Sequence, residues 1–239
     1  MSGAALAELI RTNQPCGAGA STESGLPDFR SASGIWAQYD PYEVASIEGF
    51  HRDPARVWEF YARRLGVLDE AQPNAAHHAL AELERAGWID AVVTQNVDRL
   101  HERAGSQEVI EVHGSLRTAS CLACGAREAM ELVAARLPMP RCGFCAAILK
   151  PDVVMFGEQL PAGAIDRATE LAERAALILV VGSSLEVWPV AGLPDATLAH
   201  GGKLAILNRE ATSYDARANL VVRASAGEVL ECVTSTLSS

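Results

Sequence analysis

The sequence predicts a doubly wound α/β fold, in which helices cover both faces of a parallel sheet, together with a smaller second lobe. Short apolar runs recur along the chain, among them "IDAVV" at 89–93, "ALILVV" at 176–181 and "KLAIL" at 203–207. Runs with almost no polar alternation are typical of parallel strands that are buried on both faces. Helical segments lie between the runs, and each run ends abruptly in polar or glycine residues. This alternation of strand and helix indicates a Rossmann-like sheet.

Three helices are predicted, and two of them have clear end signals. Asn74 is placed as the N-cap of a helix with apolar residues at helical spacing, which Gly87 ends. Residues 161–175 form a second helix before the next strand. A third begins where Asp53 caps the chain and Pro54 occupies the first turn.

The first strand of the sheet departs from the pattern. The segment before the first glycine pair, "IRTNQPC", is polar and contains Pro15, which cannot donate a hydrogen bond to a central ladder. The sequence therefore leaves the first strand of the sheet in doubt.

Two segments fall outside the alternation of strands and helices. Residues 31–72 are predicted to be a helical insertion, and residues 116–149 contain four paired cysteines. We expect both segments to form the smaller lobe of a single domain that spans residues 1–239.

The bulk composition limits the class of protein. The chain has 239 residues with 49% hydrophobic content, which suffices for one substantial core. Its formal net charge is -10. A protein that binds nucleic acid or an anionic membrane through its overall charge is basic, so the acidic charge argues against such partners. No apolar run reaches the length of a membrane span, and the N-terminus lacks the features of a secretory signal. We therefore expect a cytoplasmic protein with peptide or small-molecule partners.

The four paired cysteines indicate a zinc site. Cys121 and Cys124 form one C-x-x-C pair, and Cys142 and Cys145 form the other after 17 intervening residues. Two thiolate pairs on tight turns supply the four soft ligands that tetrahedral zinc accepts, and they leave no open position for water. The predicted zinc is therefore structural, one per chain. The alternative is a set of buried or disulfide-bonded cysteines.

Polar clusters follow the predicted strands and should line one crevice. The clusters begin at Thr94, Gly182 and Asn208, and the carboxyl ends of parallel strands meet at one edge of a sheet. Gly17-Ala18-Gly19 begins like a dinucleotide-binding turn, although Thr22 stands where a third glycine is usual. Each feature alone also has an ordinary structural reading: a strand-to-helix turn, a helix cap at Asp98, or a structural histidine at position 113.

Taken together, these motifs resemble the sirtuins, which are NAD-dependent protein lysine deacylases. The resemblance runs from about residue 16 to residue 230. It is carried by eight motifs in order, which are the glycine turn, "SGLPDFRS", "TQNVDRLH", "EVHGS", the two cysteine pairs, "KPDVVMFGE", "VGSS" and "LNRE". In this family the glycine turn is a variant that needs no third glycine.

The resemblance implies an NAD site and two catalytic residues. His113 is implied as the general base on the ribose hydroxyls, and Asn96 acts beside it. Ser21, Asn96 and Asp98 are implied to form the nicotinamide pocket, while Phe29 shields the reactive ribose carbon. The implied cofactor-binding set is Gly17, Ala18, Gly19, Ser21, Asp28, Phe29, Arg30, Trp36, Gln95, Asn96, Val97, Asp98, Gly182, Ser183, Ser184, Asn208, Arg209, Glu210 and Ala226.

The family also implies an acyl-lysine substrate. The substrate backbone should add as a strand between Phe156–Glu158 and Ser184–Val187. A Tyr-x-x-Arg pair, Tyr61 and Arg64, resembles the branch that removes succinyl and malonyl groups, with acetyl as a weaker substrate. The opposing reading packs Tyr61 in the lobe and leaves Arg64 in solvent. The implied substrate-binding set is Tyr61, Arg64, Ala32, Phe156, Gly157, Glu158, Leu185 and Val187.

Two other functions compete with deacylation. One is mono-ADP-ribosyl transfer or NAD hydrolysis on the same fold. The other is a zinc-ribbon interaction module, but residues 116–150 carry five basic residues and a single aromatic, Phe144, which is not the composition of a nucleic-acid surface.

Overall fold

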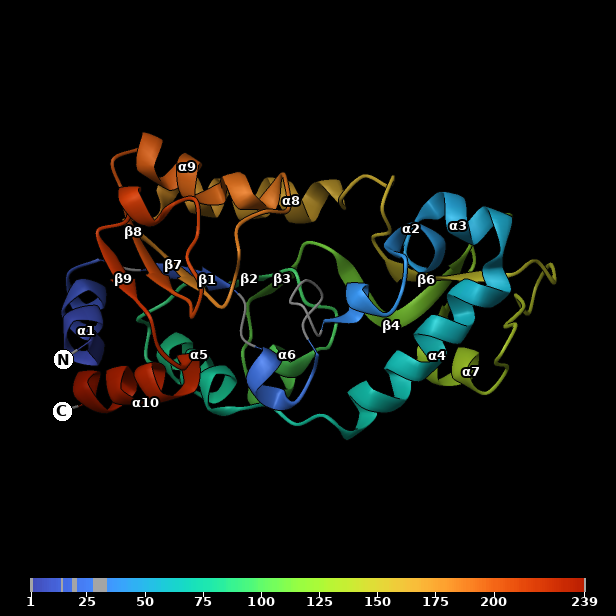
Figure 1. Ribbon diagram of the computed structural model, residues 1–239, viewed down its shortest axis with the longest axis horizontal. Coiled ribbons are helices and arrows are strands. Elements are labelled where there is room, and N and C mark those ends of the chain that lie inside the picture. The colour runs from blue at the N-terminus through green and yellow to red at the C-terminus, as the bar shows by residue number, and fades with distance from the viewer. Residues whose placement is uncertain (1, 14, 19–20, 28–33, 239) are drawn as a thin grey trace. The chain divides into compact units, whose positions relative to one another are not determined.

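The computed structural model describes residues 2–13, 15–18, 21–27 and 34–238, and the chain divides into two compact units (Figure 1). The large unit consists of residues 1–24, 72–112 and 161–239. The small unit consists of residues 25–71 and 113–160.

Six parallel strands form the sheet of the large unit, in the order β3-β2-β1-β7-β8-β9. This order is the one that two βαβαβ halves produce when they are joined side by side, so the predicted doubly wound, Rossmann-like fold is confirmed. In such sheets ligands bind outside the carboxyl ends of the strands, near the point where the order reverses. The strands are β1 (Pro15–Ala18), β2 (Val92–Thr94), β3 (Val109–Glu111), β7 (Leu177–Val181), β8 (Lys203–Leu207) and β9 (Leu220–Val222).

Strand β1 is present although the sequence left the first strand in doubt, and it includes Gly17 and Ala18 of the predicted glycine turn. Pro15 is the first residue of β1 and is paired with Leu177, and the pairing continues as far as Ala18 opposite Val180. On its other side β1 pairs with β2 through Gly17 and Val92. Proline is tolerated at the first residue of a strand, because the only hydrogen bond that the ladder lacks there is the one that its N–H would donate. A four-residue strand therefore occupies the centre of the sheet without an apolar run before it.

Helices cover both faces of this sheet. Helices α8 and α9 lie on one side, and α1, α5 and α10 lie on the other (Figure 1). The helices predicted after Asn74 and over 161–175 are confirmed as α5 and α8. Asn74 caps α5, because its Oδ1 accepts hydrogen bonds from the N–H groups of Ala76 and His77 at 2.9 and 3.2 Å. The helices of the large unit are α1 (Ser2–Thr12), α5 (Ala75–Arg85), α6 (Leu100–Ala104), α8 (Ala162–Arg174), α9 (Leu193–Ala199) and α10 (Ala226–Leu237).

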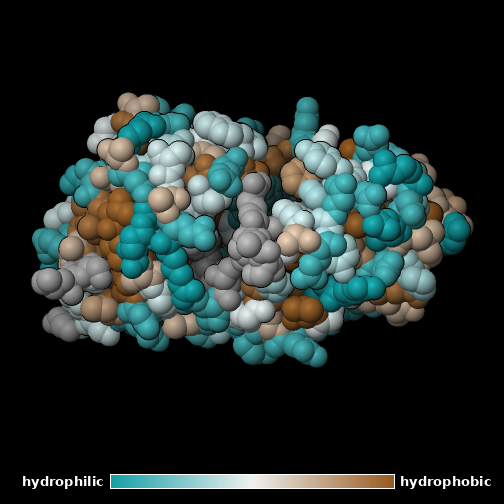
Figure 2. Space-filling model, in the orientation of Figure 1, coloured by the Kyte–Doolittle hydropathy of each residue, from teal (hydrophilic) through white to brown (hydrophobic). Residues whose placement is uncertain are grey.

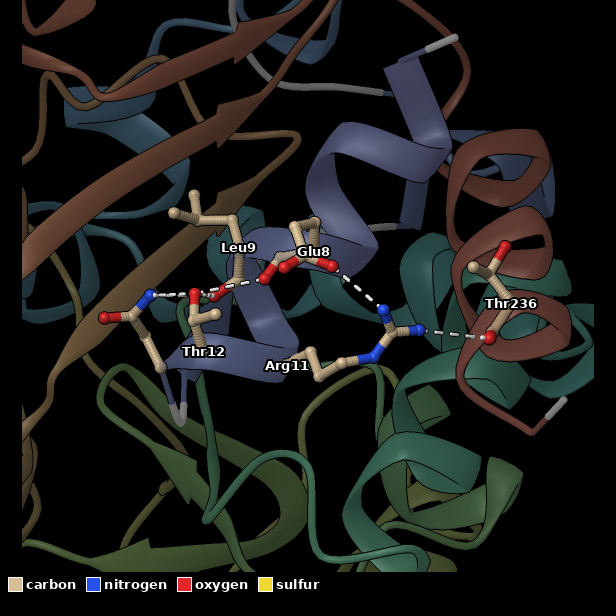
Figure 3. A network of polar contacts seen from close by, with 6 residues as sticks. Glu8, Leu9, Arg11, Thr12 and Thr236 are labelled. Carbon is tan, nitrogen blue, oxygen red and sulfur yellow. Dashed lines mark hydrogen bonds and ion pairs between the residues drawn. The ribbon is translucent and has the colours of Figure 1, made fainter.

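The N-terminal helix α1 packs on the C-terminal helix α10. Figure 3 shows Arg11 between the two, with one guanidinium nitrogen 2.9 Å from Glu8 and the other 3.5 Å from the carbonyl oxygen of Thr236. Exposed contacts of this kind contribute little. Burial of Leu6 and Ile10 in the core of the large unit is what stabilises the helix there.

The small unit combines a three-stranded antiparallel sheet with helices. Its sheet has the order β5-β4-β6. The buried Trp58 joins α4 to this sheet, because its indole N–H donates to the carbonyl of Leu149 at 2.7 Å. The helix predicted to begin at Asp53 and Pro54 is confirmed as α4. The elements are α2 (Pro41–Val44), α3 (Ile47–Arg52), α4 (Pro54–Glu70), α7 (Met130–Ala134), β4 (Gly114–Cys121), β5 (Arg127–Ala129) and β6 (Leu149–Val153).

The face of the molecule in Figure 2 is mainly polar. Hydrophilic side chains cover most of the face shown in Figure 2, and hydrophobic residues form small groups between them. Among the described residues, no helix is both long enough and apolar enough to cross a membrane. The large hydrophobic side chains that are exposed in this part of the chain are Tyr42, Val67, Leu122, Leu132, Phe144, Phe156 and Trp188.

Candidate active site and metal centre

The four predicted zinc ligands converge in the small unit. The Sγ atoms of Cys121, Cys124, Cys142 and Cys145 all lie within 4.8 Å of one another. Four sulfurs at about 2.3 Å from one zinc ion stand roughly 3.8 Å apart, so the cluster has the right size. The sulfur of Cys121 lies 3.4 Å from that of Cys145, and the sulfur of Cys124 lies 3.6 Å from that of Cys142, far beyond a disulfide bond of about 2.05 Å, and all four cysteines are free. The disulfide alternative is therefore excluded.

Two matching turns build this cluster. In the first, the N–H of Gly125 donates to the carbonyl of Cys121, and Gly125 has a φ of +76°. In the second, the N–H of Ala146 donates to the carbonyl of Cys142. A hydrogen bond from the backbone N–H of Cys124 lowers the pKa of the Cys121 thiol to about 7. A set of four thiol donors on tight turns fits a structural zinc ion and leaves no position for water.

In the large unit, the end of β2 meets the residues after the glycine turn. The Nδ2 of Asn96 donates to Oγ of Ser21 at 2.5 Å, although 75 residues separate them. Asp98 is buried, and its Oδ1 accepts a hydrogen bond from the N–H of Leu100 at the start of α6. The fold thus brings together Ser21 and Asn96, two of the three residues predicted for the nicotinamide pocket, and it uses Asp98 to begin a helix.

His77 is a member of this cluster that the sequence analysis missed. Its Nε2 lies 3.3 Å from Oγ of Ser21, and its Nδ1 accepts the N–H of Asn74 at 3.3 Å. Burial, and then repulsion from His101 and His78, lowers the pKa of His77 to about 3. The neutral ring therefore carries its proton on Nε2 and donates it to Ser21.

These contacts fix the direction of the Ser21 hydroxyl. A hydroxyl oxygen accepts two hydrogen bonds and donates one. The Ser21 oxygen accepts from Asn96 and from His77. Its own proton is therefore left to donate to a third group.

A second histidine, His101, lies next to His77. The rings of His77 and His101 are 4.7 Å apart between centroids. His101 is buried, and within the described part of the chain neither of its ring nitrogens has a hydrogen-bond partner. Burial lowers the pKa of His101 as well.

The residues predicted for the adenosine half follow β7 and β8. Gly182 has a φ of +61°, and its N–H donates to the carbonyl of Leu207 at 2.9 Å, which ties the two strand ends together. Ser183 Oγ accepts the N–H of Leu185. Asn208 Nδ2 donates to the carbonyl of Glu210 at 3.0 Å.

Glu23 connects this region to the glycine turn and was also missed. Its carboxylate accepts the N–H groups of Ala226 and Gly227, each at 3.0 Å, at the beginning of α10. It also accepts a hydrogen bond from Arg209 at 3.3 Å. A carboxylate at a helix N-terminus is favourable because it satisfies N–H groups that have no partner within the helix. Arg209 and Ala226, both predicted to contact NAD, are brought together by this residue.

His113, in the small unit, precedes β4 and has a fixed backbone. Its carbonyl accepts the N–H of Val154 at 2.9 Å. The next residue, Gly114, has a φ of +70°, and a Cβ atom there would lie 2.2 Å from the carbonyl oxygen of Asp152. Only glycine fits beside His113 at this approach of β4 to β6.

The predicted substrate edge at Phe156–Glu158 is a braced turn. The N–H and carbonyl of Phe156 bond to Ala45 and Ile47 at 2.8 and 3.0 Å. Glu158 Oε2 accepts the N–H of Met155 at 2.9 Å and pairs with Nζ of Lys150 at 2.8 Å. The Glu158 carboxylate is thus engaged within its own loop. A peptide strand along this segment has to use main-chain groups other than those of Phe156.

The predicted acyl-selecting pair lies on α4 around Phe60. Tyr61 is buried, with its ring edge-on to that of Phe60 at 5.2 Å. The guanidinium carbon of Arg64 lies 5.9 Å from the centroid of the Phe60 ring, and Arg64 is half-buried. Trp36 stacks on the same ring at 6.1 Å. Tyr61 therefore packs in the lobe, as the opposing reading expected, whereas Arg64 is not simply solvated.

Two further predicted substrate residues differ in exposure. Leu185 is buried and has a φ of +56°, whereas Val187 is half-buried.

The remaining predicted residues differ in what the structure describes. Val97, predicted to bind the cofactor, follows β2 and is half-buried. The predicted residues Gly19, Asp28, Phe29, Arg30 and Ala32 lie outside the described part of the chain.

Comparison with known proteins decides the family. The sequence pattern of the Sir2 family matches residues 17–189. The chain belongs to the Sir2 family. The sirtuin resemblance drawn from the motifs is thereby confirmed.

Relatives and solved structures of the Sir2 family agree over nearly the whole chain. An NAD-dependent protein deacetylase of Caldivirga maquilingensis is 48% identical over 221 residues, 91% of this chain and 85% of its own. NAD-dependent protein deacylase 1 of Archaeoglobus fulgidus is 45% identical over 215 residues, 90% of this chain and 88% of its own. A Sir2 homologue in complex with ADP-ribose has a TM-score of 0.92 at 41% identity, with 98% of this chain and 97% of that one covered. A Sir2 enzyme bound to a propionylated peptide has a TM-score of 0.90 at 37% identity, covering 99% and 98%.

Membership of the Sir2 family settles the class of enzyme. The chain is an NAD-dependent protein deacylase, and its four-cysteine cluster fits the structural zinc. A zinc-ribbon interaction module is excluded as the chain's main role, because the family match extends far beyond the cysteines.

Proposed function

We propose that this Sir2-family enzyme removes acidic acyl groups, succinyl and malonyl, from protein lysines, and acetyl groups more slowly. The observation that carries the proposal is the placement of Arg64 over the face of Phe60, one helical turn from the buried Tyr61. This places a permanent cation and a hydroxyl among aromatic side chains rather than in bulk water.

An acidic acyl group needs such a pair. A carboxylate that enters an apolar pocket without a partner is costly, and arginine can meet it with two parallel hydrogen bonds. Burial raises the pKa of Tyr61, so its hydroxyl stays protonated and able to donate at any physiological pH. An acetyl group presents no carboxylate to either residue.

NAD, when bound, supplies the ADP-ribosyl group that takes up the acyl group as nicotinamide leaves. Ser21, Asn96 and Asp98 would hold the nicotinamide of bound NAD. The Ser21 hydroxyl accepts hydrogen bonds from Asn96 and His77, so it would donate its own proton in a hydrogen bond to the nicotinamide. His113 would accept a proton from a ribose hydroxyl of bound NAD and so make that oxygen a better nucleophile toward the acyl carbon. The predicted adenosine residues after β7 and β8 would hold the far end of the cofactor.

The proposed substrates of this enzyme are proteins that carry acylated lysines. The Sir2 neighbour with a propionylated peptide supports a peptide ligand for this chain. Mono-ADP-ribosyl transfer or NAD hydrolysis is the alternative reaction of the same site. A cytoplasmic location stays a prediction.

Product analysis tests the proposal. The protein is incubated with NAD and one peptide that carries succinyl-, malonyl- or acetyl-lysine, and the products are identified by mass. We expect O-succinyl- and O-malonyl-ADP-ribose in equal amount to free lysine peptide, formed faster than O-acetyl-ADP-ribose. The variant His113→Gln, expected to be slower by about 100- to 10,000-fold, controls for contaminating activity. Free ADP-ribose without deacylated peptide would instead establish NAD hydrolysis.

A further inference from the structure

Trp188 is an aromatic side chain that remains largely in solvent. It is 67% exposed, next to the predicted substrate edge Ser184–Val187. Its indole lies against Gly192, because a Cβ atom on Gly192 would be 2.6 Å from Cζ3 of Trp188. One side of the ring is therefore held by the short helix Val190–Gly192, and the remainder is presented to solvent as a preorganised surface.

The surroundings of Trp188 favour a cation. Burial alternates along the edge: Leu185 is buried, whereas Glu186 and Trp188 on either side of Val187 are exposed. No lysine or arginine occurs anywhere between residues 175 and 202. The whole chain carries a net charge of -10. An exposed aromatic face in a segment that has a carboxylate two residues away in sequence and no cationic side chain attracts ammonium and guanidinium groups through cation–π and charge interactions.

We propose that Trp188, assisted by Glu186, selects substrates with a basic residue, preferably arginine, close to the acylated lysine. This inference rests on the proposed function, in which an acyl-lysine peptide lies along Ser184–Val187. A strand advances about 3.3 Å per residue, so the basic side chain that reaches Trp188 belongs to a position within two or three residues of the acylated lysine. Arginine is preferred because its planar guanidinium stacks on aromatic rings and is more weakly hydrated than an ammonium group.

The test compares peptides that differ at one flanking position. Each succinyl-lysine peptide carries arginine, leucine or glutamate at one of the three positions on either side of the acylated lysine, and kcat/KM is measured for each. At one position we expect the wild type to favour arginine over leucine by about three- to thirtyfold. Trp188→Leu should reduce this preference below about twofold and leave kcat/KM for the leucine peptide nearly unchanged. Glu186→Gln should weaken the preference by a smaller factor.

Matched variants separate this role from general effects. Phe144→Leu removes another exposed aromatic residue, and Glu173→Gln removes another exposed carboxylate, so both should keep the wild-type preference. The inference is overturned if the wild type shows no preference at any position, if Trp188→Leu keeps it, or if Trp188→Leu lowers kcat/KM for all peptides by one factor. Absence of NAD-dependent deacylation of every peptide would instead refute the proposed function.

Discussion

The ammonium nitrogen of Lys150 lies 2.8 Å from Oε2 of Glu158, with only 8% and 24% of the two side chains exposed. Lys150 also donates to the carbonyls of Pro151 and Val153. The pair therefore braces the turn that carries Phe156. The Glu158 carboxylate thus helps to fix the loop that carries the predicted substrate edge.

Removing Lys150 should destabilise the protein and weaken peptide binding. Lys150→Met leaves the partly buried Glu158 carboxylate without its cation. The free energy of unfolding should fall by about 3 kcal/mol, which is the low end for a broken buried ion pair, because water still reaches Glu158. Urea unfolding measures the loss, and KM for the peptide should rise more than kcat falls. The double variant Lys150→Met with Glu158→Leu should recover much of the stability. Equal losses in the single and double variants would contradict the bracing role.

Zinc removal should unfold the small unit's cysteine module. Cys142→Ser removes one of four ligands, so the purified variant should hold much less than one zinc ion per chain and should melt at a lower temperature. Metal analysis and thermal denaturation measure both effects. Cys232→Ser is the matched control, since Cys232 is exposed in α10, far along the chain from the cluster. Wild-type stability in a metal-free Cys142→Ser protein would show that no structural metal is needed.

His77 should make folding stability depend on pH below neutrality. Its pKa is lowered to about 3 in the folded protein, against about 6.5 when unfolded. Between these values the unfolded chain binds a proton that the folded chain does not. The stability is therefore complete above pH 6.5 and falls as the pH drops toward 3, by about 1.4 kcal/mol per pH unit for one such group.

Chemical denaturation across this range tests the role of His77. His77→Gln should have a shallower loss of stability with falling pH than the wild type, although His101 contributes in the same direction. The neighbouring His78 is exposed, so His78→Gln should keep most of the wild-type slope. An unchanged slope in His77→Gln would show that its proton binding does not differ between the two states.

The sequence predicted those parts of the fold and site that local patterns determine. The Asn74 cap and the two cysteine pairs each lie within a few residues of their partners in the chain, so spacing alone located them. Strand β1 stayed in doubt because its pairing with β7, more than 150 residues away, decides its conformation. Pro15 falls at the first residue of the strand, where proline is tolerated. Tertiary context of this kind overrides local propensity.

Glu23 and His77 were missed for the same physical reason. The partners of Glu23 in α10 are 203 and 204 residues away, and Ser21 is 56 residues from His77. A glutamate in a polar loop and a histidine in a helix carry no local signal of such contacts. The ion pair between Lys150 and Glu158 was also not foreseen, because the motif around Glu158 did not reveal that Lys150 folds back onto it.

Arg64 and Tyr61 should decide acyl selectivity rather than overall activity. A succinyl carboxylate that pairs with Arg64 and Tyr61 gains hydrogen bonds to a charged group, each contributing about 1.5 to 3 kcal/mol. Arg64→Met should therefore lower kcat/KM for a succinyl-lysine peptide by at least about tenfold, and Tyr61→Phe by a smaller factor. The acetyl peptide of the same sequence should lose less than about threefold with either variant. Arg63→Met is the matched control, because Arg63 is exposed on the same helix and pairs with Glu59 and Tyr39 instead. If Arg64→Met lowers desuccinylation and deacetylation by one common factor, the pair only supports the fold of α4 and the preference for acidic acyl groups is wrong.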